Sequence, residues 1–70
     1  MSIRSYIVAR RLHVASLLIM QTDERISQIA YSVGFNDVSN FNHAFKKLYS
    51  VSPGEYRQAH DRSEESTPQP

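Results

Sequence analysis

The chain is 70 residues long and has a mass of 8.0 kDa, which is enough for at most one compact domain and excludes a multidomain enzyme. A chain of this size buries only about 60% of the surface that its unfolded form exposes, so its core is small. The sequence contains no cysteine, which excludes a disulfide scaffold and a thiolate metal site and is typical of a reducing compartment such as the cytoplasm.

The formal net charge of +1 hides an uneven distribution along the chain. Residues 1–60 carry seven Lys/Arg and four Asp/Glu, a balance of +3, whereas residues 61–70 carry one arginine and three acidic residues, a balance of −2. The positive charge therefore belongs to the part that we expect to fold. It permits binding to nucleic acid without requiring it.

The first predicted element is a long helix over residues 3–20, which no Gly or Pro interrupts. At about 100° per residue, its apolar residues form two adjacent stripes, one of Val8, Leu12, Ala15 and Ile19 and one of Ile3, Ile7, Val14 and Leu18. A small bundle can hardly cover both stripes, so we expect the second to face a partner; a deeply buried helix is the alternative. The continuous apolar run is much shorter than the ~20 residues of a membrane span, and no cleavage pattern follows it. We expect neither a signal peptide nor a membrane partner.

Two shorter helices follow, joined by a tight turn. We expect the first over residues 25–32, with Thr22-Asp23-Glu24 supplying its cap and first-turn acids. Gly34 takes the left-handed position that ends this helix, because glycine has no Cβ to clash there. Asp37 is a good N-cap for the next helix, which we expect over residues 38–49. The apolar side chains of that helix share one face, formed by Val38, Phe41, Phe45 and Leu48.

The last helix has the clearest start in the sequence. Ser52 is its N-cap, Pro53 fits its first position and Glu55 completes a capping box. We expect this helix over residues 53–60 and a disordered tail over residues 61–70, which contain no large apolar side chain and two prolines. No segment keeps the two-residue alternation of a strand, so the predicted fold class is all-α, a long helix followed by a small three-helix unit.

The face of the 38–49 helix opposite its apolar positions contains no acidic residue; it carries Ser39, Asn40, Asn42, His43, Lys46 and Lys47. Two short helices joined by a glycine turn match the helix-turn-helix that places its second helix in the DNA major groove, although ordinary helical hairpins share this topology. Amide, hydroxyl and imidazole groups suit base edges, and ammonium groups suit phosphates. A merely solvated face, which would typically include Asp and Glu, stays the alternative for each single residue.

Three motifs follow one another in the second half of the chain: Ile26-Ser27-Gln28-Ile29-Ala30 leading to Val33-Gly34-Phe35, then Phe41-(x)3-Phe45-Lys46-Lys47, and finally Val51-Ser52-Pro53-(x)2-Tyr56-Arg57. The first helix contains Tyr6-Ile7-(x)3-Arg11-Leu12-(x)2-Ala15-(x)2-Leu18-Ile19. In this order, the motifs resemble the linker helix and second helix-turn-helix of AraC/XylS-type bacterial transcription regulators. The resemblance covers nearly all of residues 6–58 and implies a homeodomain-like helix-turn-helix unit. Ser50 stands where the family usually has glycine.

The resemblance implies a cytoplasmic, sequence-specific DNA-binding regulator, most often an activator, whose binding unit joins two helix-turn-helix halves through the linker helix. The chain resembles the second half only, so the implied partners are double-stranded DNA and a missing N-terminal half or a homologous chain. By position in the sequence, the resemblance assigns base contacts to Val38, Ser39, Asn40 and His43. Phosphate contacts fall on Asn36, Asn42, Lys46 and the start of the 26–32 helix, which includes Ser27; the charge of Lys47 adds that residue to this set.

Other classes of function have little support in the sequence. The three histidines, His13, His43 and His60, are spread over three predicted helices, and no hydrolase, metalloprotease or phosphate-binding motif is present. We therefore expect no enzymatic activity, no catalytic residue, no metal site and no cofactor. The competing interpretation is an interaction fragment that pairs through the exposed apolar stripe of helix 3–20 and binds little DNA by itself.

Overall fold

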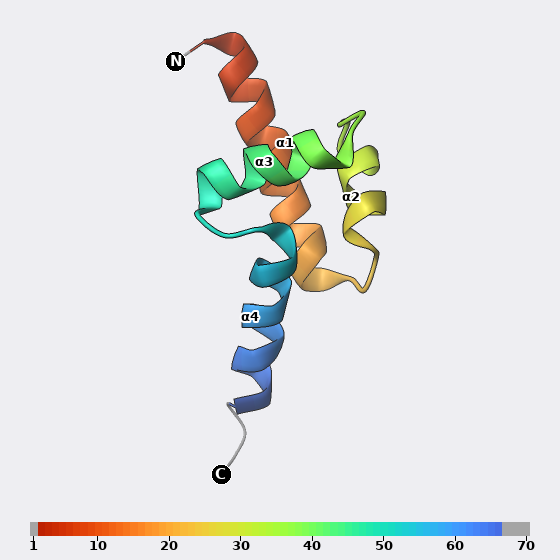
Figure 1. Cartoon of the computed structure of the whole chain (residues 1–70), viewed down its shortest axis with the longest axis vertical. Helices are drawn as coiled ribbons and strands as arrows, with labels where there is room; N and C mark the ends of the chain where they lie inside the picture. Colours follow the sequence, from red (N-terminus) through yellow and green to blue (C-terminus); the bar gives the residue numbers. More distant parts are fainter. Residues whose placement is uncertain (1, 67–70) are drawn as a thin grey trace.

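The computed structural model describes the backbone of residues 2–66 and the side chains as far as His60. The described residues form four helices and no strand: α1 (Ile3–Gln21), α2 (Ile26–Ser32), α3 (Val38–Tyr49) and α4 (Pro53–Ser66). The long α1 is contacted by each of the other three helices, with α3 crossing it and α4 extending away from the bundle (Figure 1). The predicted all-α architecture, a long helix followed by a helix-turn-helix unit, is confirmed.

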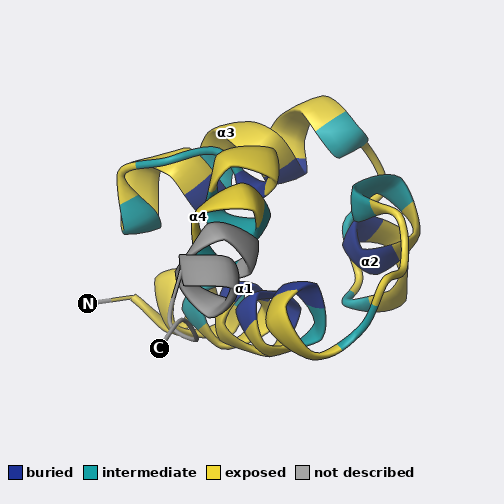
Figure 2. Ribbon diagram, turned by 90° about the horizontal axis from the view of Figure 1, so that it is seen from below, coloured by how far each residue is buried: buried dark blue, intermediate teal, exposed yellow. Residues whose placement is uncertain are grey.

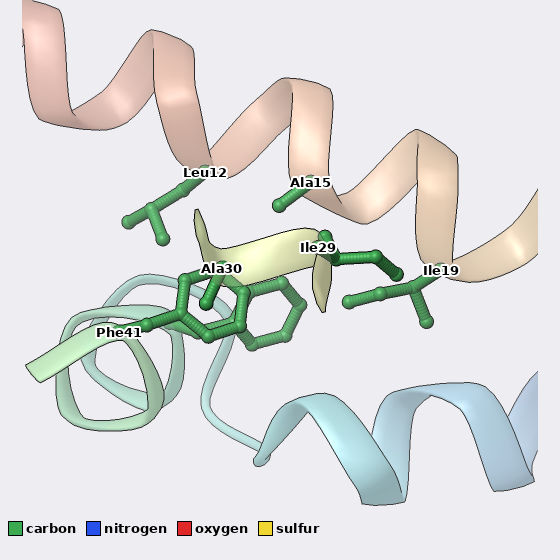
Figure 3. Close-up of a cluster of buried hydrophobic side chains, with 7 residues drawn as sticks. Leu12, Ala15, Ile19, Ile29, Ala30 and Phe41 are labelled. Atoms are coloured by element: carbon green, nitrogen blue, oxygen red, sulfur yellow. The ribbon is translucent and has the colours of Figure 1, made fainter. Parts of the chain in front are cut away.

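The core lies where α1, α2 and α3 meet. Its seven buried apolar side chains come from all three of these helices: Leu12, Ala15, Ile19, Ile29, Ala30, Phe41 and Phe45. In Figure 3 the residues of α1 point toward the ring of Phe41 and toward Ile29 and Ala30. Seen along the bundle, the buried segments face inward and the outer surfaces of α1 and α3 are exposed (Figure 2). Each helix therefore gives only one side to the core.

The two apolar stripes of α1 have different environments. The stripe that contains Leu12 and Ile19 is buried, as the core requires. On the second stripe, Ile3 is 77% exposed, Ile7 43% and Val14 42%, whereas Leu18 is half-buried against the core. The alternative of a deeply buried helix is therefore wrong, and α1 presents an uncovered apolar surface. α1 ends at Gln21, one residue beyond the predicted end.

The start of α2 differs from the prediction. The helix begins at Ile26 rather than residue 25, its N-cap is Arg25, and it has neither a side-chain cap nor an acid in its first turn. Thr22 instead caps the end of α1: its Oγ1 donates to the Leu18 carbonyl at 2.7 Å and accepts from the Glu24 N–H at 3.2 Å. The predicted role of Thr22-Asp23-Glu24 is wrong because the threonine hydroxyl is used by the preceding helix.

The turn between α2 and α3 follows the prediction closely. Gly34 has φ +104°, its N–H donates to the Tyr31 carbonyl at 3.1 Å, and the Phe35 N–H donates to the Ala30 carbonyl at 3.0 Å. These two bonds form a Schellman motif, which satisfies carbonyls that the end of α2 leaves free. The carboxylate of Asp37 then caps α3.

The end of α3 contains one correction and one strained residue. Leu48, expected on the buried face, is 51% exposed, because the contact between α1 and α3 is confined to their crossing. Ser50 closes the helix with φ +71°, a left-handed conformation that glycine adopts more easily. Its N–H donates to the Lys46 carbonyl at 2.8 Å.

The last helix has the predicted start and a later end. The Ser52 N–H donates to Glu55 Oε1 at 2.9 Å and the Glu55 N–H donates to Ser52 Oγ at 3.1 Å, which completes the capping box. α4 continues to Ser66, so the predicted end near His60 and the predicted disorder of residues 61–66 are wrong. This segment contains no Gly or Pro, and a lack of apolar side chains does not by itself end a helix. Residues 67–70 of the predicted tail lie outside the described residues.

Candidate nucleic-acid interface

The outer face of α3 is the main polar surface that the sequence predicted. Phe41 and Phe45 turn the opposite face into the core, where both rings are fully buried. All of the polar residues that were predicted to form the DNA-contacting face of this helix are exposed: Ser39, Asn40, Asn42, His43, Lys46 and Lys47. Ser39, His43 and Lys46 follow one another at intervals of four and three residues, so they form a ridge about 10 Å long. Among the described residues, neither an aromatic ring nor another helix covers this ridge.

The two ends of α3 differ in the charge of their exposed side chains. At the start, Asp37 Oδ1 accepts from the Ser39 N–H at 2.7 Å and from the Asn40 N–H at 3.4 Å. Lys46 and Lys47 occupy the last turn, where positive charge interacts favourably with the helix dipole. The uncharged polar side chains are therefore near the start and middle of the exposed ridge, and its positive charge is at the end.

A hollow of about 510 Å³ lies beside this ridge, toward the starts of α2 and α4. Four of the predicted contact residues line it: Ser39, Asn42, His43 and Lys46. Across from them are Ile26 at the start of α2 and Ser52 and Gly54 at the start of α4. The structure thus brings together predicted base and phosphate contacts and adds the start of α4, which sequence reasoning did not place here although the capping box marked that helix start.

A second hollow, of about 660 Å³, lies on the other side of the ridge, between α3 and the first half of α1. It is lined by Asn40, His43 and Lys47 from the predicted set, together with residues of α1 and the turn. His43 lines both hollows and therefore occupies the crest between them.

Three further predicted contact residues lie outside both hollows. Val38 is half-buried, as expected for the edge of the apolar face. Ser27 is half-buried in the first turn of α2, whereas Asn36 is exposed in the turn between α2 and α3. The structure therefore gathers most of the predicted set around α3 and leaves Ser27 and Asn36 at its border.

Arg57 is a residue whose structural role the sequence did not reveal. Its guanidinium donates to three main-chain carbonyls: Nε to Ile19 at 3.2 Å, Nη1 to Glu24 at 2.6 Å and Nη2 to Thr22 at 2.9 Å. These bonds tie α4 to the end of α1 and to the connection that leads into α2. Arg57 therefore holds together the elements that border the hollow beside α3, through contacts across more than thirty residues of sequence.

Glu55, in the first turn of α4, is engaged with the N-cap of its own helix. The N–H and hydroxyl of Ser52 hold the carboxylate of Glu55 and lower its pKa below the ordinary value, and Lys46 lowers it further by a smaller amount. Within the described part of the chain, no group of three His, Asp or Glu side chains is arranged to hold a metal ion. None of the described helices is both long enough and apolar enough to cross a membrane.

An exposed, acid-free polar ridge on the second helix of a glycine-turn pair is the arrangement of helix-turn-helix DNA-binding domains. Comparison with known families agrees: residues 1–59 match the family described as "Helix-turn-helix domain". The chain belongs to this family, in the branch of AraC/XylS-type transcription regulators. The family consists of transcription regulators rather than enzymes.

Curated relatives and a solved structure agree with this assignment. The transcriptional activator RhrA of Rhizobium meliloti is 50% identical over 54 residues, which are 74% of this chain and 17% of RhrA. The HTH-type transcriptional regulator MtrA of Neisseria gonorrhoeae is 45% identical over 67% of this chain and 16% of MtrA. The HTH-type transcriptional activator RhaS of Enterobacter sp. is 41% identical over 83% of this chain and 21% of RhaS. The chain thus spans about a fifth or less of these relatives.

The crystal structure of the C-terminal domain of the response regulator yesN from Fusobacterium nucleatum has the same fold. The two structures superpose with a TM-score of 0.79 at 37% sequence identity. The match covers 81% of this chain and 55% of the yesN domain.

Proposed function

We propose that the chain is one half of an AraC-type DNA-binding domain and that α3 enters the major groove of double-stranded DNA. The observation that carries this proposal is the exposed face of α3, which is free of acidic side chains and lies opposite the buried rings of Phe41 and Phe45. An α-helix fits the major groove, where each base pair presents a distinct set of donors and acceptors.

The proposed roles follow the chemistry and position of the side chains. Ser39, Asn40 and His43 offer donors and acceptors to base edges, and Val38 touches a thymine methyl from the margin of the core. Lys46 and Lys47, at the end of the helix, meet phosphates. The other proposed phosphate contacts are Asn36, Asn42 and Ser27.

Binding by this half alone is expected to be weak and strongly dependent on salt. A single module buries about 600–1,000 Å² on DNA, and non-specific complexes have Kd values of about 10⁻⁴–10⁻⁶ M at physiological salt. The match to only 55% of the yesN domain supports a further segment that supplies the rest of the interface. The relatives named as activators favour activation of transcription, and a regulator of bacterial DNA acts in the cytoplasm.

Fluorescence anisotropy with labelled duplexes at several salt concentrations tests the proposal. Replacing Lys46 or Lys47 with Gln is expected to reduce the slope of log K against log salt by about 1, whereas the same change at Arg10, on α1, leaves it unchanged. The wild-type chain is first used to select duplexes from a random library. A variant with Ser39 and His43 changed to Ala should bind these selected duplexes no more tightly than random DNA. Binding no stronger than that of an unrelated protein of equal charge would reject autonomous DNA binding.

The exposed stripe on α1 favours a second candidate function. Ile3, Ile7 and Val14 are exposed apolar residues on the stripe of α1 beside the buried one, and a first helix-turn-helix half or a homologous chain would bury them. Sedimentation velocity over a range of concentrations tests self-pairing, with Val14→Glu expected to abolish any association. A chain that stays monomeric at millimolar concentration would reject pairing with itself and leave a heterologous half as the partner.

A further inference from the structure

The groove between α1 and α3, the 660 Å³ hollow described above, is not explained by a helix inserted into DNA. Its apolar floor is built from both helices and from the turn between α2 and α3, and comprises Val8, Leu12, Phe35 and Ala44. Leu48 is 51% exposed and projects at the rim. A phosphate backbone would leave this apolar floor without a matching surface.

The dimensions of the groove suit a short helical segment. Residues from Arg4 to Leu12 line it on the α1 side and residues from Asn40 to Leu48 on the α3 side, which is about 12 Å or slightly more than two turns of each helix. Because α3 crosses α1, the two sides diverge, and a docked helix of about two turns would lie along one of them. Alanines line both walls, and their short side chains leave room between the helices. Grooves of this type accept the apolar face of an amphipathic helix, whose large side chains recur one turn apart.

The charge of the groove indicates what must flank those apolar side chains. Arg4 on the α1 side and Lys47 on the α3 side carry positive charge, and none of the described side chains that line the groove is acidic. A partner with carboxylates on both sides of its apolar residues would therefore be complementary to the groove, and a basic helix would be repelled.

We propose that the α1–α3 groove is a docking site for an acidic amphipathic helix of a partner protein. Asn40, His43 and Lys47 border the groove and belong to the proposed DNA-contacting face. The docked helix and DNA therefore compete for this side of α3, a consequence that rests on the proposed function. The apolar stripe of Ile3, Ile7 and Val14 is a different surface of α1, because none of its residues lines this groove.

A labelled synthetic helical peptide with two leucines four residues apart, flanked by glutamates, is the probe, titrated against the whole chain by fluorescence anisotropy. Leu48→Ser and Arg4→Gln are each expected to weaken binding by roughly tenfold. Ile3→Ser is the matched control, because Ile3 is an exposed apolar residue of α1 outside the groove, and it should bind as the wild type does. Thermal melts of the variants exclude unfolding as the cause.

The outcomes separate the groove from the proposed DNA binding. Saturable binding that is lost when the leucines of the peptide become serines, or when its glutamates become lysines, supports the groove. An equal loss in Leu48→Ser and Ile3→Ser, no saturable binding, or equal binding of the lysine peptide would overturn it. Displacement of the peptide by a DNA duplex supports competition, and a stable ternary complex refutes it. A chain that binds the peptide and no duplex would reject the proposed function and leave the docking site in place.

Discussion

The guanidinium of Arg57 connects three parts of the chain, and its removal should destabilise the whole domain. It donates to the carbonyls of Ile19, Thr22 and Glu24, and so joins α4 to the end of α1 and the start of the α2 segment. In Arg57→Ala these carbonyls lose their donor. A hydrogen bond contributes about 0.5–1.5 kcal/mol net, and somewhat more with a charged donor, so three bonds from a half-buried side chain contribute about 2–4 kcal/mol.

This amount is large for so small a domain. Stabilities of about 0.05–0.15 kcal/mol per residue place the wild-type chain in the range of about 3–10 kcal/mol. The loss corresponds to a fall in Tm of roughly 8–32 °C, because 1 kcal/mol shifts Tm by about 4–8 °C at this size. Urea denaturation followed by far-UV circular dichroism measures the free energy of unfolding directly, and thermal melts measure the shift.

Two further variants make the measurement decisive. Arg10→Ala removes the same charge from an exposed position of α1 and should change stability by less than about 0.5 kcal/mol. Arg57→Lys keeps the charge but cannot direct three donors at separate carbonyls, so it should recover less than half of the loss. If Arg57→Ala unfolds at the same urea concentration as Arg10→Ala, or if Arg57→Lys is as stable as the wild type, the three hydrogen bonds of Arg57 do not stabilise the domain.

Three other predictions concern the caps and turns. Ser50→Gly should raise the free energy of unfolding by about 0.5–1 kcal/mol. Glycine relieves the left-handed strain at φ +71°, and its greater conformational freedom in the unfolded chain offsets part of this gain. A lower Tm would contradict the prediction. Gly34→Ala should lower the free energy of unfolding, measured by urea titration, by more than about 1 kcal/mol. The reason is that φ is +104° at this position and the new Cβ would lie 3.1 Å from Arg11 Nε. A variant as stable as the wild type would show that the strain is negligible. Hydrogen bonds from Ser52 lower the pKa of Glu55 in the folded chain. The ionised Glu55 therefore contributes to the stability of the fold above the ordinary pKa of 4.5, and this contribution is lost as the pH falls through the lowered pKa. Melts of Glu55→Gln and wild type should therefore differ at pH 7 and converge in acid, and a constant difference would refute the assignment.

The features that the sequence predicted best depend on residues close together in the chain. Asp37 caps α3 through N–H groups two and three residues away, and Ser52 and Glu55 bond to each other over three residues. Gly34 ends α2 through bonds that reach back no further than Ala30. Such interactions are determined by local backbone geometry, so residue type and spacing suffice to predict them.

The errors arose where a tertiary contact decides between two local possibilities. Thr22 is suited to cap the helix that follows it, but its hydroxyl caps α1, and its carbonyl is held by Arg57, which is 35 residues away. Leu48 continues the apolar spacing of Phe41 and Phe45, yet it lies beyond the crossing with α1 and stays exposed. No pattern within α3 reveals where a crossing helix stops covering it.

The same crossing explains why the candidate interface is available. Because α3 crosses α1, a few large side chains are enough to fix it: Phe41 and Phe45 are fully buried, and the ring of Phe45 lies 4.5 Å from Tyr49 and 5.4 Å from Tyr56 of α4. This aromatic cluster anchors the helix from one side, so its opposite side need not contribute to stability and is free to carry polar groups. Substitutions along the exposed ridge, of which His43 is the crest, should therefore change binding to DNA far more than they change folding, whereas substitutions of the two phenylalanines should do the reverse. A ridge substitution such as His43→Ala that cost several kcal/mol of stability would show that this face is part of the fold and would refute its assignment as a DNA-contacting surface.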